Sequence, residues 1–252
     1  MASLFLLSLT YCPIINAQLV NIESQRIQKD SLRFVLIADL TYNSQKNNDE
    51  SLTFFSIAAT TQLKSKSLKK LYLLLVSSDY AIANGQKLSN SGLFHFRYNH
   101  RINKYLKLEA FTQMQYNQIQ DLKSRTLIGA GPRLKILGEK SAKLYFGSLY
   151  MFEYEKTLDN SITKFDFHRI SSYFSVSLDL PKKVGELVSV TYYQPRLDLF
   201  TDFRISNQSS LNLNLTSKIV FSNNVNLMYD AVPPNGVTRF NINYCSGIKF
   251  IF

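Results

Sequence analysis

The C-terminal end of the chain, residues 237–252, reads VTRFNINYCSGIKFIF. Apolar and polar side chains alternate along its whole length, which is the period of a β-strand with two different faces. A strand that places apolar groups in lipid and polar groups in a barrel lumen has this pattern. The stretch therefore predicts a strand of an outer-membrane β-barrel. One face carries Thr238, Phe240, Ile242, Tyr244, Ser246, Ile248, Phe250 and Phe252, and the other carries Arg239, Asn241, Asn243, Cys245, Gly247, Lys249 and Ile251.

The N-terminal end of the chain agrees with export. Residues 4–9 form a short apolar run, and Asn16-Ala17-Gln18 follows as a candidate cleavage site. This layout is typical of a secretory signal peptide. We therefore predict a signal peptide over residues 1–17 and an extended lead-in over residues 18–30. A lipoprotein signal ending at Cys12 is disfavoured, because the bulky Tyr11 stands where a small residue normally precedes the cysteine.

The composition restricts the fold class to all-β. After the signal region no segment reaches the roughly 20 consecutive apolar residues of a spanning helix. A membrane protein without such helices must be a closed barrel, which pairs every backbone group between strands. The 15 Tyr and 18 Phe of the chain are residue types that strands and membrane-interface girdles favour. Removal of the signal would leave Cys245 as a lone thiol, so we expect no disulfide.

Alternating segments divide the rest of the chain into twelve expected strands of one transmembrane antiparallel barrel, over residues 31–252. Short, lysine-rich connections alternate along the chain with longer, more acidic ones. This pattern predicts short periplasmic turns and longer outer loops. The expected strands are 31–44, 51–64, 68–80, 90–102, 104–118, 123–137, 142–155, 167–180, 186–197, 202–220, 224–232 and 237–252. The short turns are 65–67, 103–104, 138–140, 181–185 and 222–224, and the outer loops are 43–50, 79–90, 118–123, 156–166, 195–201 and 233–236.

Charged residues in the middle of a strand decide which face is the lumen face. An Arg or Lys that faces lipid near the bilayer midplane costs about 2–4 kcal/mol. The facing of segments 51–64 and 68–80, which carry few charges, stays open. The predicted lumen face of 104–118 carries Lys107, Glu109, Phe111, Gln113, Gln115 and Asn117, and that of 202–220 carries Arg204, Ser206, Gln208, Ser210, Asn212 and Asn214.

One stretch resembles a known family. Residues 121–131 follow the pattern Asp-Leu-x-x-Arg-x-x-x-Gly-x-Gly, and residues 147–155 and 169–173 extend the likeness. Over residues 105–180 the chain is similar to the salt-induced outer-membrane proteins, a family of barrels without an established activity. The resemblance implies a barrel and a compartment, the outer membrane, and leaves the function open.

Antiparallel pairing predicts a cluster of charged side chains in the lumen near the outer rim. With turns near 120–121, 139–140 and 161, the cluster consists of Asn117, Arg125, Glu153, Glu155 and Arg169. The same register predicts two further pairs, Glu109 with Arg133 and Asp230 with Arg239. Such pairs can fill and stiffen a narrow barrel, because buried charges need partners. They can also form a constriction that selects anionic or zwitterionic solutes.

Three functions follow as hypotheses. The first is a narrow solute channel with a charged, anion-leaning lumen. The second is a structural barrel with a plugged lumen, whose outer loops bind a partner or lipopolysaccharide. The third is a lipid-active enzyme, but only His95, His100 and His168 could serve as a base, and no serine signature stands beside them. We therefore predict no enzyme.

Other sites and partners follow from residue spacing and charge. No His/Cys spacing indicates a metal site, and no cofactor is expected. Residues 129–131 lie inside an expected strand, where glycine indicates close packing or curvature. The net charge of +11 lies largely beside the expected periplasmic turns, which favours anionic lipid headgroups. The expected partners are outer-membrane lipids, lipopolysaccharide, small anionic solutes and, through the strand ending at Phe252, the barrel-assembly machinery, with no nucleic acid.

Overall fold

The computed structural model describes residues 6–8, 33–48, 50–139, 141–157, 164–216, 219–233 and 236–251. They form one antiparallel sheet with a short 3-10 helix, η1 (Pro181–Lys183). No helix among them is long and apolar enough to cross a membrane. The strands are β1 (Leu6–Ser8), β2 (Phe34–Asn47), β3 (Glu50–Lys64), β4 (Lys70–Ala83), β5 (Gln86–Arg101), β6 (Leu106–Asn117), β7 (Leu122–Gly138), β8 (Ala142–Thr157), β9 (Lys164–Asp179), β10 (Gly185–Pro195), β11 (Phe203–Asn214), β12 (Ile219–Asp230) and β13 (Phe240–Ile251).

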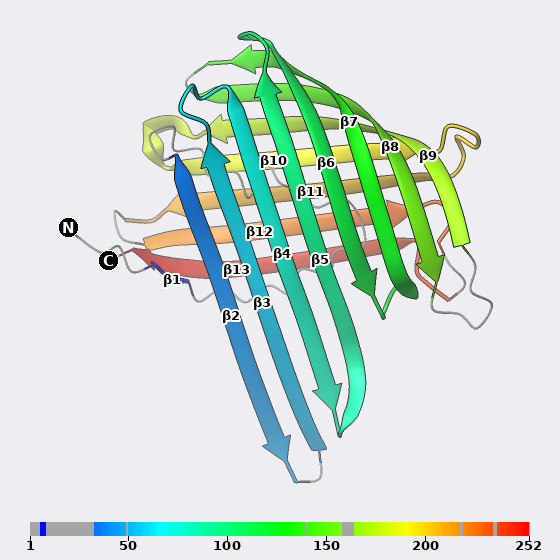
Figure 1. Cartoon of the computed structure of the whole chain (residues 1–252). Helices are drawn as coiled ribbons and strands as arrows, with labels where there is room; N and C mark the ends of the chain where they lie inside the picture. The colour runs from blue at the N-terminus through cyan, green and yellow to red at the C-terminus, as the bar shows by residue number, and fades with distance from the viewer. Residues whose placement is uncertain are drawn as a thin grey trace.

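The sheet is rolled into a barrel. In Figure 1 the strands β2 to β8 form one wall and β10 to β13 cross behind it. Antiparallel ladders join each strand to the next from β2 to β13. The described residues contain no ladder between β2 and β13, so these two strands border a seam. Twelve antiparallel strands, β2 to β13, confirm the predicted fold class.

The additional strand β1 lies within the predicted signal peptide. Leu6–Ser8 pair with the last residues of β13. The remainder of the predicted signal peptide and the lead-in at 18–30 lie outside the described residues, as does Phe252. The prediction of export therefore stays a prediction.

One predicted turn is wrong. Residues 222–224 were expected to connect two strands, but they lie inside β12, and the chain turns instead after Asn214. These polar side chains are bonded to neighbouring strands. Ser222 donates to Asn212 Oδ1 over 2.7 Å, and Asn223 donates to the Tyr244 hydroxyl over 2.6 Å. Ser and Asn, which usually indicate a turn, here serve as cross-strand partners.

Two of the predicted outer loops are also wrong. Residues 43–50 and 79–90 were expected to be long connections, but β2 to β5 continue through most of them and project beyond the other strands (Figure 1). The β4–β5 connection is only Asn84-Gly85, with φ of 50° and 74°. Positive φ at both central residues defines the type I′ turn that matches the twist of a hairpin. This dipeptide is the sequence signal for a long hairpin in place of a loop.

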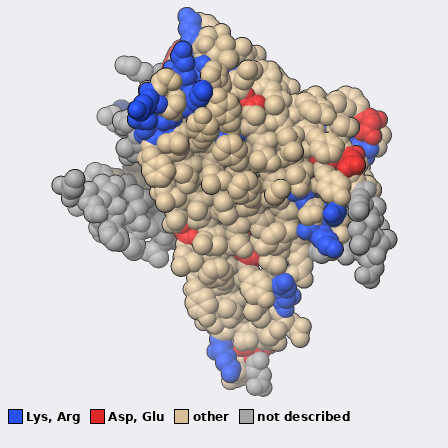
Figure 2. Space-filling model, viewed as in Figure 1, with Lys and Arg blue, Asp and Glu red and all other residues tan. Residues whose placement is uncertain are grey.

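The alternation of faces is confirmed. On β6 the predicted lumen residues are buried or half-buried, whereas Leu108, Met114 and Tyr116 of the opposite face are exposed. The facing of β3 and β4 is now fixed, because Gln62 and Leu73 are buried on the inner side. Figure 2 shows the outer face of the β2-containing wall, where the middle is almost entirely uncharged and Lys, Arg, Asp and Glu gather toward the ends.

Part of the interior is a packed apolar core. Inward side chains of β6 to β10 contact one another and exclude solvent. The cluster consists of Phe111, Leu127, Leu149, Met151, Tyr173, Val190 and Tyr192. Because it occupies the inner face of the barrel, this half of the lumen is filled by side chains.

Glycines in β7 and β8 make room for the aromatic rings of this core. A Cβ at Gly147 would lie 2.2 Å from the Tyr173 ring, and one at Gly129 would lie 2.5 Å from the Phe111 ring. A Cβ at Gly131 would lie 2.3 Å from the Ser148 carbonyl oxygen of β8. The glycines of 129–131 therefore permit close packing, as the sequence predicts.

We expect Gly147→Ala to destabilise the barrel by about 1–3 kcal/mol, because an added methyl in a packed core displaces its neighbours. Urea unfolding in lipid vesicles, followed by circular dichroism, measures the change. The control is a double-mutant cycle with Tyr173→Leu, because this substitution removes the aromatic ring that the added methyl group would contact. If Gly147→Ala costs as much in the Tyr173→Leu background, the ring is not the cause.

Candidate functional site

One network of ion pairs inside the barrel is centred on Glu153, on the inner face of β8. Its carboxylate oxygens lie 2.9 Å from Arg125 Nε and 2.6 Å from Arg169 Nε, on the two neighbouring strands β7 and β9. It also accepts a hydrogen bond from Arg204 of β11. The side chain of Glu153 is 0% exposed. A carboxylate buried this deeply stays charged only with such partners.

Arg204 connects the two sides of the lumen. Its strand, β11, is separated from β8 by β9 and β10 in the sheet, so the Arg204–Glu153 ion pair crosses the interior. Arg204 also lies 3.4 Å from Glu155 of β8 and 2.8 Å from Asp230 of β12. Glu155 in turn binds Arg125 at 2.6 Å. The guanidinium thus joins three carboxylates from two walls.

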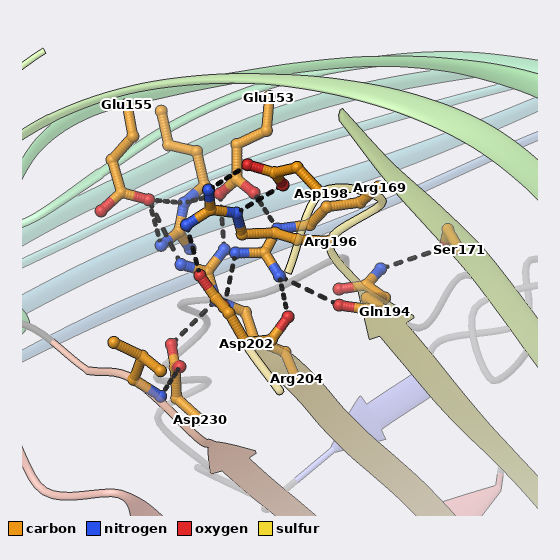
Figure 3. A network of polar contacts seen from close by, with 12 residues as sticks. Glu153, Glu155, Arg169, Ser171, Gln194, Arg196, Asp198, Asp202, Arg204 and Asp230 are labelled. Atoms are coloured by element: carbon orange, nitrogen blue, oxygen red, sulfur yellow. Dashed lines mark hydrogen bonds and ion pairs between the residues drawn. The ribbon is translucent and has the colours of Figure 1, made fainter. Parts of the chain in front are cut away.

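The loop between β10 and β11 completes the network at the rim. Asp202 is buried and binds Arg169 and Arg196, each at 3.0 Å. Figure 3 shows how Arg169, Arg196 and Arg204 converge with Glu153, Glu155 and Asp202. Asp198, at the exposed edge, binds Arg196. Hydrogen bonds from Arg196 lower the pKa of the Asp198 carboxyl below its usual value.

A second network lies deeper, around Glu109 of β6. Arg97 of β5 and Arg133 of β7 each approach its carboxylate at 3.3 Å. The Tyr173 hydroxyl of β9 donates to Glu109 over 2.6 Å. All four side chains are buried. The hydrogen bond from Tyr173 crosses the interior, since β7 and β8 separate β9 from β6.

The structure brings together most of the residues predicted for the lumen. Arg125, Glu153, Glu155 and Arg169 share the first network, and Glu109 contacts Arg133 in the second. Asn117 is buried on the inner face of β6, where its side chain accepts a hydrogen bond from the Gln120 backbone rather than from an arginine.

The predicted pairing of Asp230 with Arg239 is wrong at the level of side chains. The two residues are joined by a backbone hydrogen bond of 2.8 Å. Register places Asp230 opposite Arg204 on β11, and this arginine takes its carboxylate. Arg204 lies within β11, directly opposite Asp230, whereas Arg239 lies before the start of β13.

Sequence reasoning missed several members of the networks. Arg204 was assigned to the lumen but not to the cluster, because its contacts cross the barrel. Asp202 stands at the start of the expected strand 202–220, and Arg196 in the expected outer loop 195–201, so neither was assigned to the lumen. Arg97 and Tyr173 lie on the same strand faces as buried neighbours, so the alternation of residues alone could have found them.

The histidines do not form a nucleophile–base pair among the described residues. His168 faces outward and its Nδ1 is bonded to the Tyr150 hydroxyl at 2.5 Å. His95 is bonded to Gln113 and His100 to Tyr98. A serine nucleophile needs such a base within hydrogen-bond reach. The described part of the chain also contains no group of three or more His, Cys, Asp or Glu that could hold a metal ion.

Comparison with known families identifies the chain. The sequence profile of the family described as "Protein of unknown function, DUF481" matches residues 38–248. The chain belongs to the DUF481 family. In this DUF481 protein the 121–131 stretch has a clear structural role, since Asp121 turns with a φ of 54°, Arg125 enters the first network and Gly129 packs under Phe111.

Three solved structures illustrate what the DUF481 chain is similar to. A "NanC porin" is 11% identical with a TM-score of 0.48 and covers 86% of this chain and 98% of its own. A "Bacterial polysaccharide outer membrane secretin" is 10% identical with a TM-score of 0.45 and covers 87% and 90%. A "KdgM porin" is 11% identical with a TM-score of 0.41 and covers 86% and 99%. The comparison with curated proteins finds no match.

We expect Glu153→Gln to destabilise the barrel by about 3–5 kcal/mol, because it removes the buried charge shared by three arginines. Urea unfolding in vesicles measures the loss. The matched control is Asp198→Asn, on the exposed edge of the same network, which should leave the unfolding midpoint unchanged. Equal effects of the two substitutions would contradict a dominant role for Glu153.

Proposed function

We propose that this protein is an outer-membrane barrel that passes small polar solutes through the part of its lumen beside β2–β4 and β11–β13. The membrane placement is supported by the outer surface. Phe94, Leu108, Ile128 and Phe174 are among the large apolar side chains exposed on that surface. Exposed apolar area of this extent is costly in water and favourable in lipid.

The lysine-rich turns fit the same placement. Lys66, Lys69, Lys104 and Lys182 lie in the short connections at one end of the barrel. Their ammonium groups would meet anionic headgroups at the membrane surface. The opposite end, with the longer β10–β11 and β12–β13 connections, then faces outward.

The proposed passage follows the polar half of the interior. On β6 to β9 most inward side chains are buried, and the two networks connect opposite walls of the barrel. On β11 to β13 nine of the inward side chains are uncharged and polar, and most of these nine are half-buried or exposed. They are Ser206, Gln208, Ser210, Asn212, Ser222, Asn224, Asn226, Asn241 and Asn243.

The charge balance argues against an anion-leaning lumen. In the first network Arg125, Arg169, Arg196 and Arg204 face the five carboxylates of Glu153, Glu155, Asp198, Asp202 and Asp230. In the second network Arg97 and Arg133 face Glu109, so the formal charges of the two networks together cancel. Inward Asp79 is held by the Ser56 hydroxyl, and inward Asp39 is exposed. Neither has a basic partner among the described residues. Because paired arginines present little field to a solute, we propose a passage that favours cations over anions.

The filled half of the lumen favours one alternative, a plugged structural barrel. If the polar half is also closed in the membrane, no solute passes, and the rim loops become the binding surface. The β10–β11 loop exposes Leu197, Leu199 and Phe200 beside the anchored Asp202, so a partner could bind there.

Planar-bilayer recording of the refolded protein decides between these functions. We expect a small, steady conductance with a reversal potential that indicates cation preference, reduced by Asp39→Asn/Asp79→Asn. Asp198→Asn, outside the proposed passage, is the control. An anion preference that falls in Arg125→Ala/Arg169→Ala would support the anion-leaning channel instead. A folded, heat-modifiable and electrically silent barrel would support the plugged one.

The seam between β2 and β13 should close in the membrane. Unpaired backbone groups facing lipid cost several kcal/mol each. In a Cys12→Ser background, we expect one of three inward β2 substitutions, Ile37→Cys, Asp39→Cys or Thr41→Cys, to form a disulfide with the inward Cys245 thiol. Mobility under non-reducing conditions measures it. Outward Leu36→Cys and Leu40→Cys are the controls, and a disulfide at none of the inward positions would contradict closure.

A further inference from the structure

Polar side chains interrupt the lipid-facing surface on one wall of the barrel. They lie on the outward faces of β10 to β13, near the middle of these strands. We call them the outer polar patch, which consists of Ser189, Thr191, Asn207, Ser209, Asn223, Tyr244 and Ser246. None of them carries a charge.

One half of the patch is organised by Asn207 of β11. Its amide donates to Thr191 Oγ1 over 2.8 Å and to Ser189 Oγ over 3.2 Å. Its carbonyl accepts from the Ser209 hydroxyl over 2.9 Å. The Ser189 and Ser209 hydroxyls are 2.8 Å apart. These groups therefore lie together on the surface.

The other half is organised by Asn223 of β12. Its amide donates to the Tyr244 hydroxyl over 2.6 Å and to Ser246 Oγ over 3.0 Å. Ser246 also donates to the Tyr244 hydroxyl over 2.7 Å. Register places Ser209 opposite Val225, two residues from Asn223, so the halves are diagonal neighbours.

Two hydroxyls of the patch have a hydrogen left to donate. Thr191 and Tyr244 act as acceptors in the bonds above, and both are exposed, Tyr244 by 64%. Neither donates to another side chain among the described residues. Acyl chains cannot accept these hydrogen bonds, and a polar group left unpaired in an apolar medium is costly.

The outward faces of β2 to β7 differ in composition from those of β10 to β13. The middle of their outward faces carries aliphatic, aromatic and small residues, with isolated hydroxyls and no asparagine. Examples are Leu40, Ile57, Val76, Phe96, Ala110, Thr112, Ile128 and Ala130. The outward faces of β2 to β7 therefore carry no comparable patch at mid-strand.

We propose that the outer polar patch is the contact surface for a second copy of this chain within the membrane. The proposal rests on the membrane placement proposed above. Copies inserted in the same direction hold their outer polar patches at the same depth in the membrane. A two-fold axis along the membrane normal therefore places the patch of one copy against the patch of the other. Hydroxyl and amide groups both donate and accept, and an uncharged surface meets itself without repulsion. The spare hydroxyls of one copy then reach acceptors on the other.

Sedimentation of the refolded protein in neutral, density-matched micelles tests the proposal. We expect a concentration-dependent dimer in the wild type. Thr191→Val/Tyr244→Phe, which removes only the two spare hydroxyls, should raise the dimer dissociation constant about tenfold or more. The matched control is Thr112→Val/Tyr116→Phe on the outward face of β6, which should dimerise as the wild type does.

The outcomes separate this inference from the proposed function. Heat-modifiable mobility shows whether each variant folds as a barrel, and bilayer conductance shows whether it passes ions. Neither measurement depends on the oligomeric state. A wild type that folds and conducts but sediments as a monomer overturns the dimer alone. An unchanged dissociation constant in Thr191→Val/Tyr244→Phe also overturns it. If that variant does not fold, Tyr244→Phe alone provides the same comparison against Tyr116→Phe.

Discussion

The ion pairs of one buried carboxylate, Glu153, connect opposite walls of the barrel. Glu153 is fully buried on β8, and burial of an unpaired charge would cost several kcal/mol. Arginines from β7, β9 and β11 meet that requirement. Two of these strands are the neighbours of β8, but β11 is not, so the contact fixes the curvature of the sheet as well as its register. Arg204 must reach across the interior, and the distance that its side chain can span limits the width of the lumen.

The same constraint divides the interior into two halves. Once β8 and β11 are tied together, the inward side chains of the strands around β8 are forced into contact, and apolar residues such as Leu149 and Met151 become favourable there. Large rings then need room, which the glycines opposite them supply. The Glu109 network repeats the arrangement at a deeper level, with Tyr173 as the crossing group. The asparagine- and serine-lined half joins the first network at one end, through Arg204 of β11 and Asp230 of β12.

Much of the fold and of the first network could be predicted from sequence, because the alternation of polar and apolar residues reports which side of a strand each side chain occupies. It identified the twelve strands and the faces of those that carry a charge in mid-strand, and antiparallel pairing brought Arg125, Glu153, Glu155 and Arg169 together, since those residues lie on consecutive strands. It could not place Arg204 or Asp202. The partner of Arg204 depends on how far the sheet curls, and that of Asp202 on the path of a loop. The error at 222–224 has a different origin, because Ser and Asn are favoured in turns but also serve as hydrogen-bonding partners across strands, on either face of this sheet.

The net charge of the chain is a poor guide to the field inside it. A net charge of +11 suggests a lumen that attracts anions, but the excess is carried mainly by lysines, and those in the short turns lie at one end of the barrel. The arginines of the two networks lie inside the barrel or at its rim, each beside a carboxylate. An arginine paired with carboxylates can offer well-oriented hydrogen bonds to a passing solute, but its net electrostatic potential at the solute is small. Selectivity must therefore come from charges that the protein leaves uncompensated. On the inner face of β2 and β4 those charges are Asp39 and Asp79, and their sign is opposite to that of the whole chain.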